Sequence, residues 1–156
     1  ISNDNNEARD FAVLASSTKL LRNIDILYRQ RTNEQTEITF ISNETLERLK
    51  QIHQVTDEKA ANWKFNRDFE ALERTRKQLF TTDKRCLKIS TIQSFKGWES
   101  PSVIVILEND IVLHNTTFRP MSPQTIYTAI TRARENMYII NIGNDTYHNF
   151  FYNQTL

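Results

Sequence analysis

The chain has 156 residues and a formal net charge of +1, from 20 basic and 19 acidic side chains. This length predicts one domain with a hydrophobic core, and the balanced charge does not by itself predict a nucleic-acid-binding surface. A single cysteine excludes an internal disulfide, and no apolar run approaches the roughly 20 residues that span a bilayer. Because no signal peptide is visible, we expect a cytoplasmic, monomeric domain without membrane contacts.

The first part of the chain predicts a strand–helix–strand unit. Residues 1–10 are polar and predict a loose linker, and the apolar run FAVLA at 11–15 predicts the first inner strand. Hydroxyl residues that can cap a helix follow, and apolar residues at one-face spacing predict an amphipathic helix over 18–30. Residues 36–41 alternate and predict the next strand, so this unit implies a parallel pair with a right-handed crossover.

Residues 43–85 differ in character, since they contain neither glycine nor proline. Two apolar stripes predict two helices on the flank of the sheet, which we interpret as a helical insertion at about 43–82. Basic side chains gather at Arg74, Arg76, Lys77, Lys84 and Arg85. This cluster either contacts nucleic acid or forms a solvated, self-neutralised helix face.

The stretch LKISTIQSFKGWESPSVIVIL at 87–107 organises the domain. It predicts two inner strands, at 87–91 and 103–107, joined by a tight polar turn over 93–99. The turn holds Gly97, one of only two glycines, where the backbone needs positive φ or close approach to a ligand. The alternative interpretation is a plain strand connection that needed one glycine.

The C-terminal part predicts one more helix and strand before a terminal helix at 145–152. Residues 108–121 predict a loop, and Ser122 followed by proline predicts a helix start. Arg132 lies off the buried stripe of this helix, and residues 137–142 predict the last inner strand. The stripe itself consists of Ile126, Ile130, Ala133 and Met137.

Two strings resemble motifs of the superfamily-one helicases of the UvrD, Rep and PcrA type. TIQSFKGWE at 91–99 resembles motif V, whose usual form is Thr-(Ile/Leu)-His-x-x-Lys-Gly-(Leu)-Glu. IYTAITRARENMYII at 126–140 resembles motif VI, whose core is (Ala/Val)-(Leu/Val)-Thr-Arg-Ala. The resemblance is specific over 85–143. It implies an α/β fold with a RecA-like parallel sheet flanked by helices, the C-terminal half of an ATP-dependent DNA helicase or translocase.

The resemblance suggests four nucleotide-binding candidates. Arg132 matches the arginine finger, with a surface arginine paired to Glu135 as the alternative. Glu99 would lie beside the ribose, and Gly97 would let the backbone come close. The strand-aligned motif IV position is Ser16, so the nearest candidate for that phosphate contact is Arg22, which could equally be a solvated helix arginine.

The chain contains no Gly-x-x-x-x-Gly-Lys-Ser/Thr loop, so it lacks its own P-loop. ATP and Mg²⁺ would therefore be bound mainly by an N-terminal RecA-like half that is absent from this chain, and we expect no metal site within it. The isolated domain is predicted to hydrolyse no ATP.

The resemblance also implies contacts with single-stranded DNA, RNA not being excluded, through Thr91, Gln93, Ser94 and Lys96. Gln93 stands where the family usually has histidine. Trp98 stands in place of the usual leucine; we expect it to pack in the core, with base stacking as the alternative. Together with Ser16, Gln93 leaves open a catalytically silent nucleic-acid-binding or docking module. An unrelated flavodoxin-like α/β domain is the third interpretation.

Overall fold

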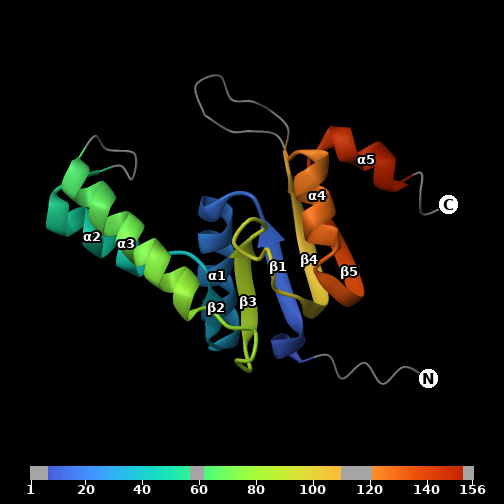
Figure 1. The fold of residues 1–156 in the computed structure, drawn as a ribbon, viewed down its shortest axis with the longest axis horizontal. Coiled ribbons are helices and arrows are strands. Elements are labelled where there is room, and N and C mark those ends of the chain that lie inside the picture. The colour runs from blue at the N-terminus through green and yellow to red at the C-terminus, as the bar shows by residue number, and fades with distance from the viewer. Residues whose placement is uncertain (1–6, 57–61, 110–120, 153–156) are drawn as a thin grey trace.

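The computed structural model describes residues 7–56, 62–109 and 121–152. It contains a five-stranded, all-parallel sheet in the order β2-β3-β1-β4-β5, flanked by helices (Figure 1). The strands are β1 (Phe11–Ala15), β2 (Thr36–Ile38), β3 (Leu87–Thr91), β4 (Ser100–Glu108) and β5 (Ala133–Ile142). The helices are α1 (Thr18–Thr32), α2 (Asn43–His53), α3 (Trp63–Leu79), α4 (Pro123–Ile130) and α5 (Asp145–Tyr152). The predicted α/β parallel sheet flanked by helices is therefore confirmed.

The middle of the sheet is formed by the strands that the sequence marks as apolar. β1 pairs with β3 on one side and with β4 on the other, so the two strands that flank the polar turn are both inner strands. The predicted direct pair of β1 and β2 is wrong, because β3 lies between them. β2 has only three residues and is partly exposed, which fits an edge position better than the centre.

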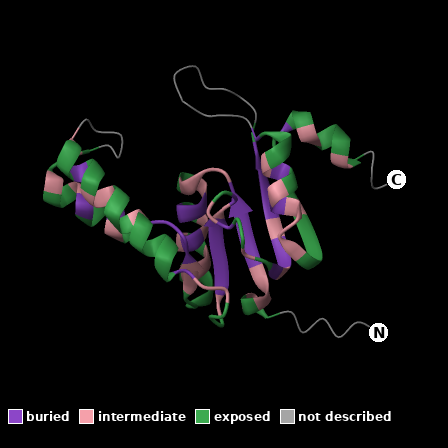
Figure 2. Cartoon of the chain, in the orientation of Figure 1, coloured by how far each residue is buried: buried purple, intermediate pink, exposed green. Residues whose placement is uncertain are grey.

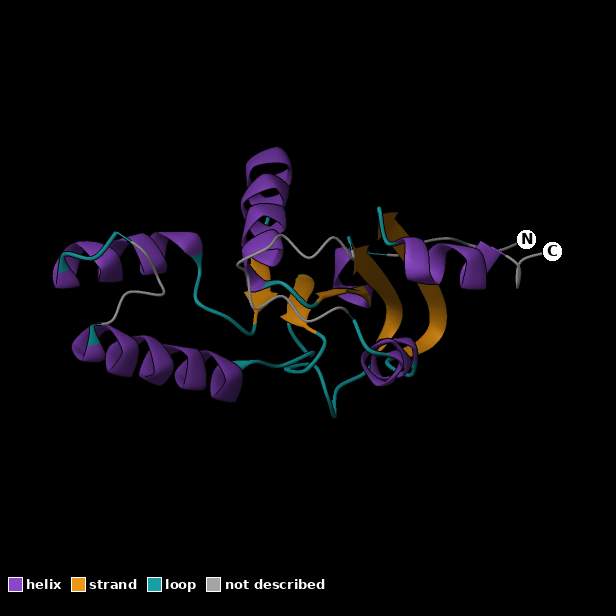
Figure 3. Cartoon of the chain, turned by 90° about the horizontal axis from the view of Figure 1, so that it is seen from above, coloured by secondary structure: helices purple, strands orange, loops and turns teal. Residues whose placement is uncertain are grey.

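The two faces of the sheet bury two separate cores. Along β1, Val13 and Ala15 pack toward α1, whereas Ala12 and Leu14 pack toward α4, as the two-residue repeat of a strand requires. Seen from above, the sheet lies between these two helices (Figure 3). The predicted helix starts are confirmed: Ser17 accepts a hydrogen bond from the Leu20 amide and Ser122 from the Thr125 amide.

The segment after α4 corrects the sequence prediction. The helix ends at Ile130, and β5 begins three residues later at Ala133, although Ala133 and Met137 continue the helical stripe. Main-chain pairing with β4 along nearly the whole of β5 outweighs that apolar spacing. β5 is also the outer strand of the sheet, so the prediction of a last inner strand is wrong, and Met137 is 39% exposed.

Helices α2 and α3 form a hairpin that projects from the flank of the sheet (Figure 1). The hairpin has its own small core, made by Ile41, Leu46, Leu49 and Phe65. Its remaining surface is mostly exposed, in contrast to the buried inner strands (Figure 2). No described helix is long and apolar enough to cross a membrane. Part of the predicted linker (1–6), of the helical insertion (57–61) and of the predicted loop (110–120) lies outside the described residues.

Candidate functional site

The motif V segment, residues 91–99, connects the two ends of the parallel sheet. Thr91 closes β3 at the carboxyl end of the sheet, level with Ala15 of β1. The chain then returns to the amino end, where Ser100 starts β4 and lies beside Ala133 of β5. At the usual rise of a strand, the two ends are about 20 Å apart. Thr91, a predicted nucleic-acid residue, and the predicted nucleotide residues Glu99 and Arg132 therefore lie near opposite ends of the sheet, and the adjacent Lys96 and Gly97 lie in the segment between them.

One buried aliphatic side chain and one buried aromatic side chain hold the motif V segment against the sheet. Ile92 and Phe95 both enter the core on the α4 side, and the Phe95 amide donates to the Thr91 carbonyl at 3.0 Å. Gly97 has φ +95°, a conformation that favours glycine, and a Cβ at this position would meet no atom within 4 Å. The glycine is thus required by the backbone turn rather than by close packing inside the chain.

At the carboxyl end, the segment presents hydroxyl, amide and ammonium groups. Thr91 Oγ1 accepts a hydrogen bond from the Ser94 amide at 3.2 Å, and both residues are half-buried. Gln93 and Lys96 are exposed, and the Lys96 amide donates to the Gln93 carbonyl at 3.4 Å. These four side chains can reach a phosphate backbone, since donors of this kind bind phosphate oxygens.

At the amino end, Arg132 joins motif VI to motif V. It lies in the turn between α4 and β5, not on the helix as predicted. Its guanidinium is half-buried and donates to the Thr128 carbonyl at 3.1 Å, the Trp98 carbonyl at 3.4 Å and Thr131 Oγ1 at 3.0 Å. The Ser100 amide donates in turn to the Arg132 carbonyl at 3.0 Å.

All three acceptors of the Arg132 guanidinium are uncharged oxygens, so in the described part of the chain it forms no ion pair with Glu135. Glu99 is exposed in the same amino-end turn, two residues after Gly97. Trp98, between them, packs edge-on against Phe80 with ring centroids 5.6 Å apart, so the predicted core packing is confirmed.

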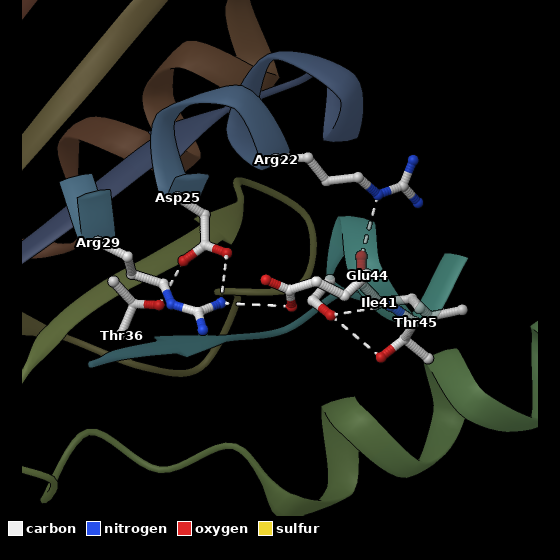
Figure 4. A network of polar contacts seen from close by, with 8 residues as sticks. Arg22, Asp25, Arg29, Thr36, Ile41, Glu44 and Thr45 are labelled. Atoms are coloured by element: carbon white, nitrogen blue, oxygen red, sulfur yellow. Dashed lines mark hydrogen bonds and ion pairs between the residues drawn. The ribbon is translucent and has the colours of Figure 1, made fainter. Parts of the chain in front are cut away.

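Arg22 lies in a different part of the molecule. It is 4% exposed, so the solvated alternative is wrong, and its Nε donates to the Ile41 carbonyl at 3.0 Å. Figure 4 shows this contact beside a network in which Arg29 approaches both Asp25 (3.7 Å) and Glu44 (3.6 Å). The network joins α1 to the start of the hairpin, beyond edge strand β2. The structure therefore does not bring Arg22 together with the arginine that precedes β5.

Three buried ionisable residues were not singled out by the sequence: Asp25, described above, Glu108 and Lys88. Glu108 ends β4, and its Oε2 accepts hydrogen bonds from the amides of Ser16 (2.8 Å) and Ser17 (3.0 Å). Burial raises the pKa of Glu108, although these hydrogen bonds act in the opposite direction. Burial likewise lowers the pKa of Lys88, whose Nζ donates to the Arg9 carbonyl. A charged residue within or directly after an apolar strand was the available signal for Glu108 and Lys88.

Among the described residues, no three His, Cys, Asp or Glu side chains lie close enough together to hold a metal ion. The Glu108 carboxylate, at the end of β4, accepts hydrogen bonds from the Ser16 and Ser17 amides at the start of α1. What the amino end offers a nucleotide is thus one guanidinium, one exposed carboxylate and, beside them, the positive-φ glycine Gly97.

Comparison with known protein families shows what the chain is similar to. Residues 12–141 match the family model described as the viral superfamily 1 RNA helicase core domain. The matched range runs from β1 to the end of β5 and includes both motif segments. A search of curated proteins finds no match.

Proposed function

Because the chain belongs to the family of viral superfamily 1 RNA helicase core domains, we propose that it is the C-terminal motor half of an ATP-dependent helicase or translocase. The sequence contains no P-loop, so the proposed motor also needs an N-terminal RecA-like half that binds ATP and Mg²⁺. Within superfamily one, the motif V and motif VI strings favour the UvrD, Rep and PcrA type.

The observation that carries this proposal is the position of Arg132. The guanidinium lies at the junction of the two motifs, held by main-chain and hydroxyl oxygens at 3.0–3.4 Å. Neutral acceptors of this kind bind a guanidinium less strongly than a phosphate does, because charge-assisted hydrogen bonds are roughly twice as strong. Arg132 can therefore exchange them for the γ-phosphate of an ATP bound across the domain interface, and act as an arginine finger.

The neighbouring groups suit a nucleotide at the same end. Glu99 is exposed and can accept hydrogen bonds from ribose hydroxyls, and Gly97 has open space above its α-carbon. In this proposal the finger supplies charge to the transition state, whereas the carboxylate contributes to ground-state nucleotide binding.

At the carboxyl end, Thr91, Gln93, Ser94 and Lys96 are proposed to hold the backbone of a single nucleic-acid strand. Hydroxyl, amide and ammonium donors position a backbone without reading its sequence. The name of the matched family mentions RNA. Single-stranded RNA is therefore the first substrate to test, and single-stranded DNA, which the motif strings favour, is the second.

The test is steady-state ATP hydrolysis by the polypeptide that carries both halves, with saturating single-stranded nucleic acid. Arg132→Ala should lower kcat by about a thousandfold, since loss of an arginine finger has an effect of this size. Arg132→Lys should recover only part of the rate, because a point charge does not reproduce the planar fork. Arg134→Ala, an exposed arginine two residues on, is the matched control and should leave kcat unchanged.

A kcat for Arg132→Ala within about threefold of the wild type would refute the finger assignment. A large drop in Tm without a specific loss of kcat would show instead that the arginine serves the fold. The 156-residue chain by itself should hydrolyse no ATP, and hydrolysis that single-stranded nucleic acid stimulates in a clean preparation would contradict the half-motor proposal.

A further inference from the structure

One face of α3 carries an aromatic ring and a row of basic side chains away from the hairpin core. Successive helical residues are rotated by about 100°, so Trp63 lies about 200° from Phe65, which is fully buried between the two helices. The same spacing places Arg67, Arg74 and Lys77 within about 40° of Trp63. We call these four residues, Trp63, Arg67, Arg74 and Lys77, the α3 stripe.

Trp63 is the most exposed tryptophan of the chain, with 65% of its surface accessible. Lys64 Nζ lies 5.8 Å and Arg67 Cζ 5.4 Å from the centre of its ring. Cations at this distance are attracted to the ring face and enrich its surroundings in positive charge. Both cations lie over the ring, and an exposed aromatic ring beside basic side chains is a surface on which nucleic-acid bases can stack.

The charges along α3 are mixed but favour an anionic partner. The helix carries five basic residues, Lys64, Arg67, Arg74, Arg76 and Lys77, and three acidic residues, Asp68, Glu70 and Glu73. Glu70 lies within the stripe, whereas Asp68 and Glu73 pair with Arg67 (3.0 Å) and Lys77 (3.7 Å). These exposed ion pairs are weak, so a phosphate can replace the carboxylate partners.

The aliphatic side chains that the hairpin exposes lie elsewhere. Leu72 and Leu79 are about 160–180° around the helix from Trp63, and Ile52 is on α2. The stripe also borders a shallow hollow of about 470 Å³, lined by Glu70, Glu73, Arg74, Lys77 and Gln78. A surface with one aromatic ring, three cations, the single carboxylate of Glu70 and no aliphatic side chain fits a nucleic-acid strand better than an apolar protein surface.

We propose that the α3 stripe is a second binding surface for single-stranded nucleic acid, outside the motif V and motif VI site. A base stacks on Trp63, and backbone phosphates pair with Arg67, Arg74 and Lys77 along about 15 Å of helix. The hairpin leaves the sheet after β2, at the carboxyl end, and α3 leads back to the amino end of β3. This inference rests on the proposed function for its class of ligand.

The chain contains two tryptophans, so Trp98→Phe leaves Trp63 as the sole tryptophan reporter. The test is a fluorescence titration of this variant with single-stranded oligo(U) and oligo(dT) at low salt. We expect both oligonucleotides to quench Trp63, while heparin, which has charge but no bases, binds without comparable quenching. We also expect Trp63→Ala to weaken the Kd about 5- to 150-fold in the wild-type background, the loss of one stacked base.

Tyr127→Ala is the matched control, because Tyr127 is 70% exposed on α4, away from the hairpin, and its loss should leave the Kd unchanged. If the oligonucleotides bind but Trp63→Ala leaves the Kd unchanged, the α3 stripe is wrong while the proposed motor function stands. Equal quenching by heparin would reduce the surface to a purely electrostatic one and overturn the stacking proposal. If no oligonucleotide binds, the α3 stripe proposal is refuted. The motor proposal is then tested separately by ATP hydrolysis of the Arg132→Ala variant.

Discussion

The two proposed sites, one near each end of the sheet, hold their polar side chains in different ways. At the amino end, hydrogen bonds cross between segments far apart in sequence, from Arg132 to the Trp98 carbonyl and from the Ser100 amide back to Arg132. At the carboxyl end, the proposed nucleic-acid residues Thr91 and Ser94 bond each other within one turn, and the long-range contacts there are made by Glu108 to the Ser16 and Ser17 amides. A charge that must meet a reacting phosphate needs a fixed position. Contacts to a nucleic-acid backbone tolerate looser placement, and the difference matches the two proposed roles.

Phe95 connects the two ends, so its removal should have the largest effect on the protein itself. It is fully buried and meets Phe80 edge-on, with ring centroids 6.0 Å apart. Phe95→Ala should lower the free energy of unfolding by about 3–5 kcal/mol, the usual result of emptying an aromatic site in a core. Urea unfolding measures this change. Phe150→Ala, at a ring that is 58% exposed on α5, is the control, and an equal loss there would show that Phe95 has no special role.

Gly97→Ala tests whether the return from one end to the other needs an unusual backbone. A Cβ would meet no atom within 4 Å, so only the φ of +95° is costly. We expect a loss of about 1–3 kcal/mol in the free energy of unfolding, the usual cost of a sparsely populated backbone region. Gly97→Asn should lose less, since asparagine adopts positive φ more readily. Stability equal to the wild type in both variants would mean that the turn relaxes freely.

Two single substitutions can separate the ends by function, in the polypeptide that carries both halves. Glu99→Ala should raise the KM for ATP about tenfold with kcat little changed, because a charged hydrogen bond to the ribose is lost from ground and transition states alike. Ser94→Ala, at the other end, should leave the KM for ATP unchanged and weaken binding of the nucleic-acid strand. A collapse of kcat in Glu99→Ala would remove the ribose assignment.

The smallest effect concerns Glu108, near the carboxyl end. Burial raises the pKa of Glu108 in the folded protein, so the folded state holds this proton more tightly than the unfolded state does. Its contribution to stability is therefore greatest below the unfolded pKa and declines as the pH rises through the folded pKa. Glu108→Gln keeps an oxygen acceptor for the Ser16 and Ser17 amides but cannot ionise.

Thermal melts of the wild type and of Glu108→Gln between pH 4 and pH 8 measure this linkage. The difference in Tm should move in favour of the glutamine variant as the pH rises. Glu135→Gln, at an exposed position on β5, should show no such trend. A constant difference between the wild type and Glu108→Gln across the range would show that the carboxyl has the same pKa in both states.

Much of the sheet follows from local sequence. FAVLA at β1, the apolar run within β4 and the Ser-Pro start of α4 each combine composition with a boundary signal, and all three occur as predicted. The end of α4 did not follow, because Ala133 and Met137 continue a helical spacing while the same residues pair with β4. Strand pairing depends on residues far apart in the sequence, so a local pattern of apolar residues cannot reveal it. The position of β3 between β1 and β2 escaped prediction for the same reason.

The sequence supplies the candidate site residues, and only the structure supplies their arrangement. The motif strings single out Thr91, Glu99 and Arg132, yet only the register of β4 with β5 shows that the last two lie at one end and Thr91 at the other. Glu108 and Trp63 were not identified as functional candidates. Glu108 stands out because it is buried, and Trp63 because it is exposed. Neither property can be read from one residue and its neighbours.

The acceptor that Trp98 offers to Arg132 is a main-chain carbonyl, not its indole ring. Any residue at position 98 supplies the same carbonyl oxygen. Tryptophan or leucine at this position therefore leaves the hydrogen bond from Arg132 unchanged. Alanine substitution at position 98 therefore leaves this hydrogen bond in place, and Arg132→Ala removes it together with the other contacts of the guanidinium. An ester in place of the peptide bond between residues 98 and 99 weakens the carbonyl acceptor and tests this one contact while Arg132 is kept.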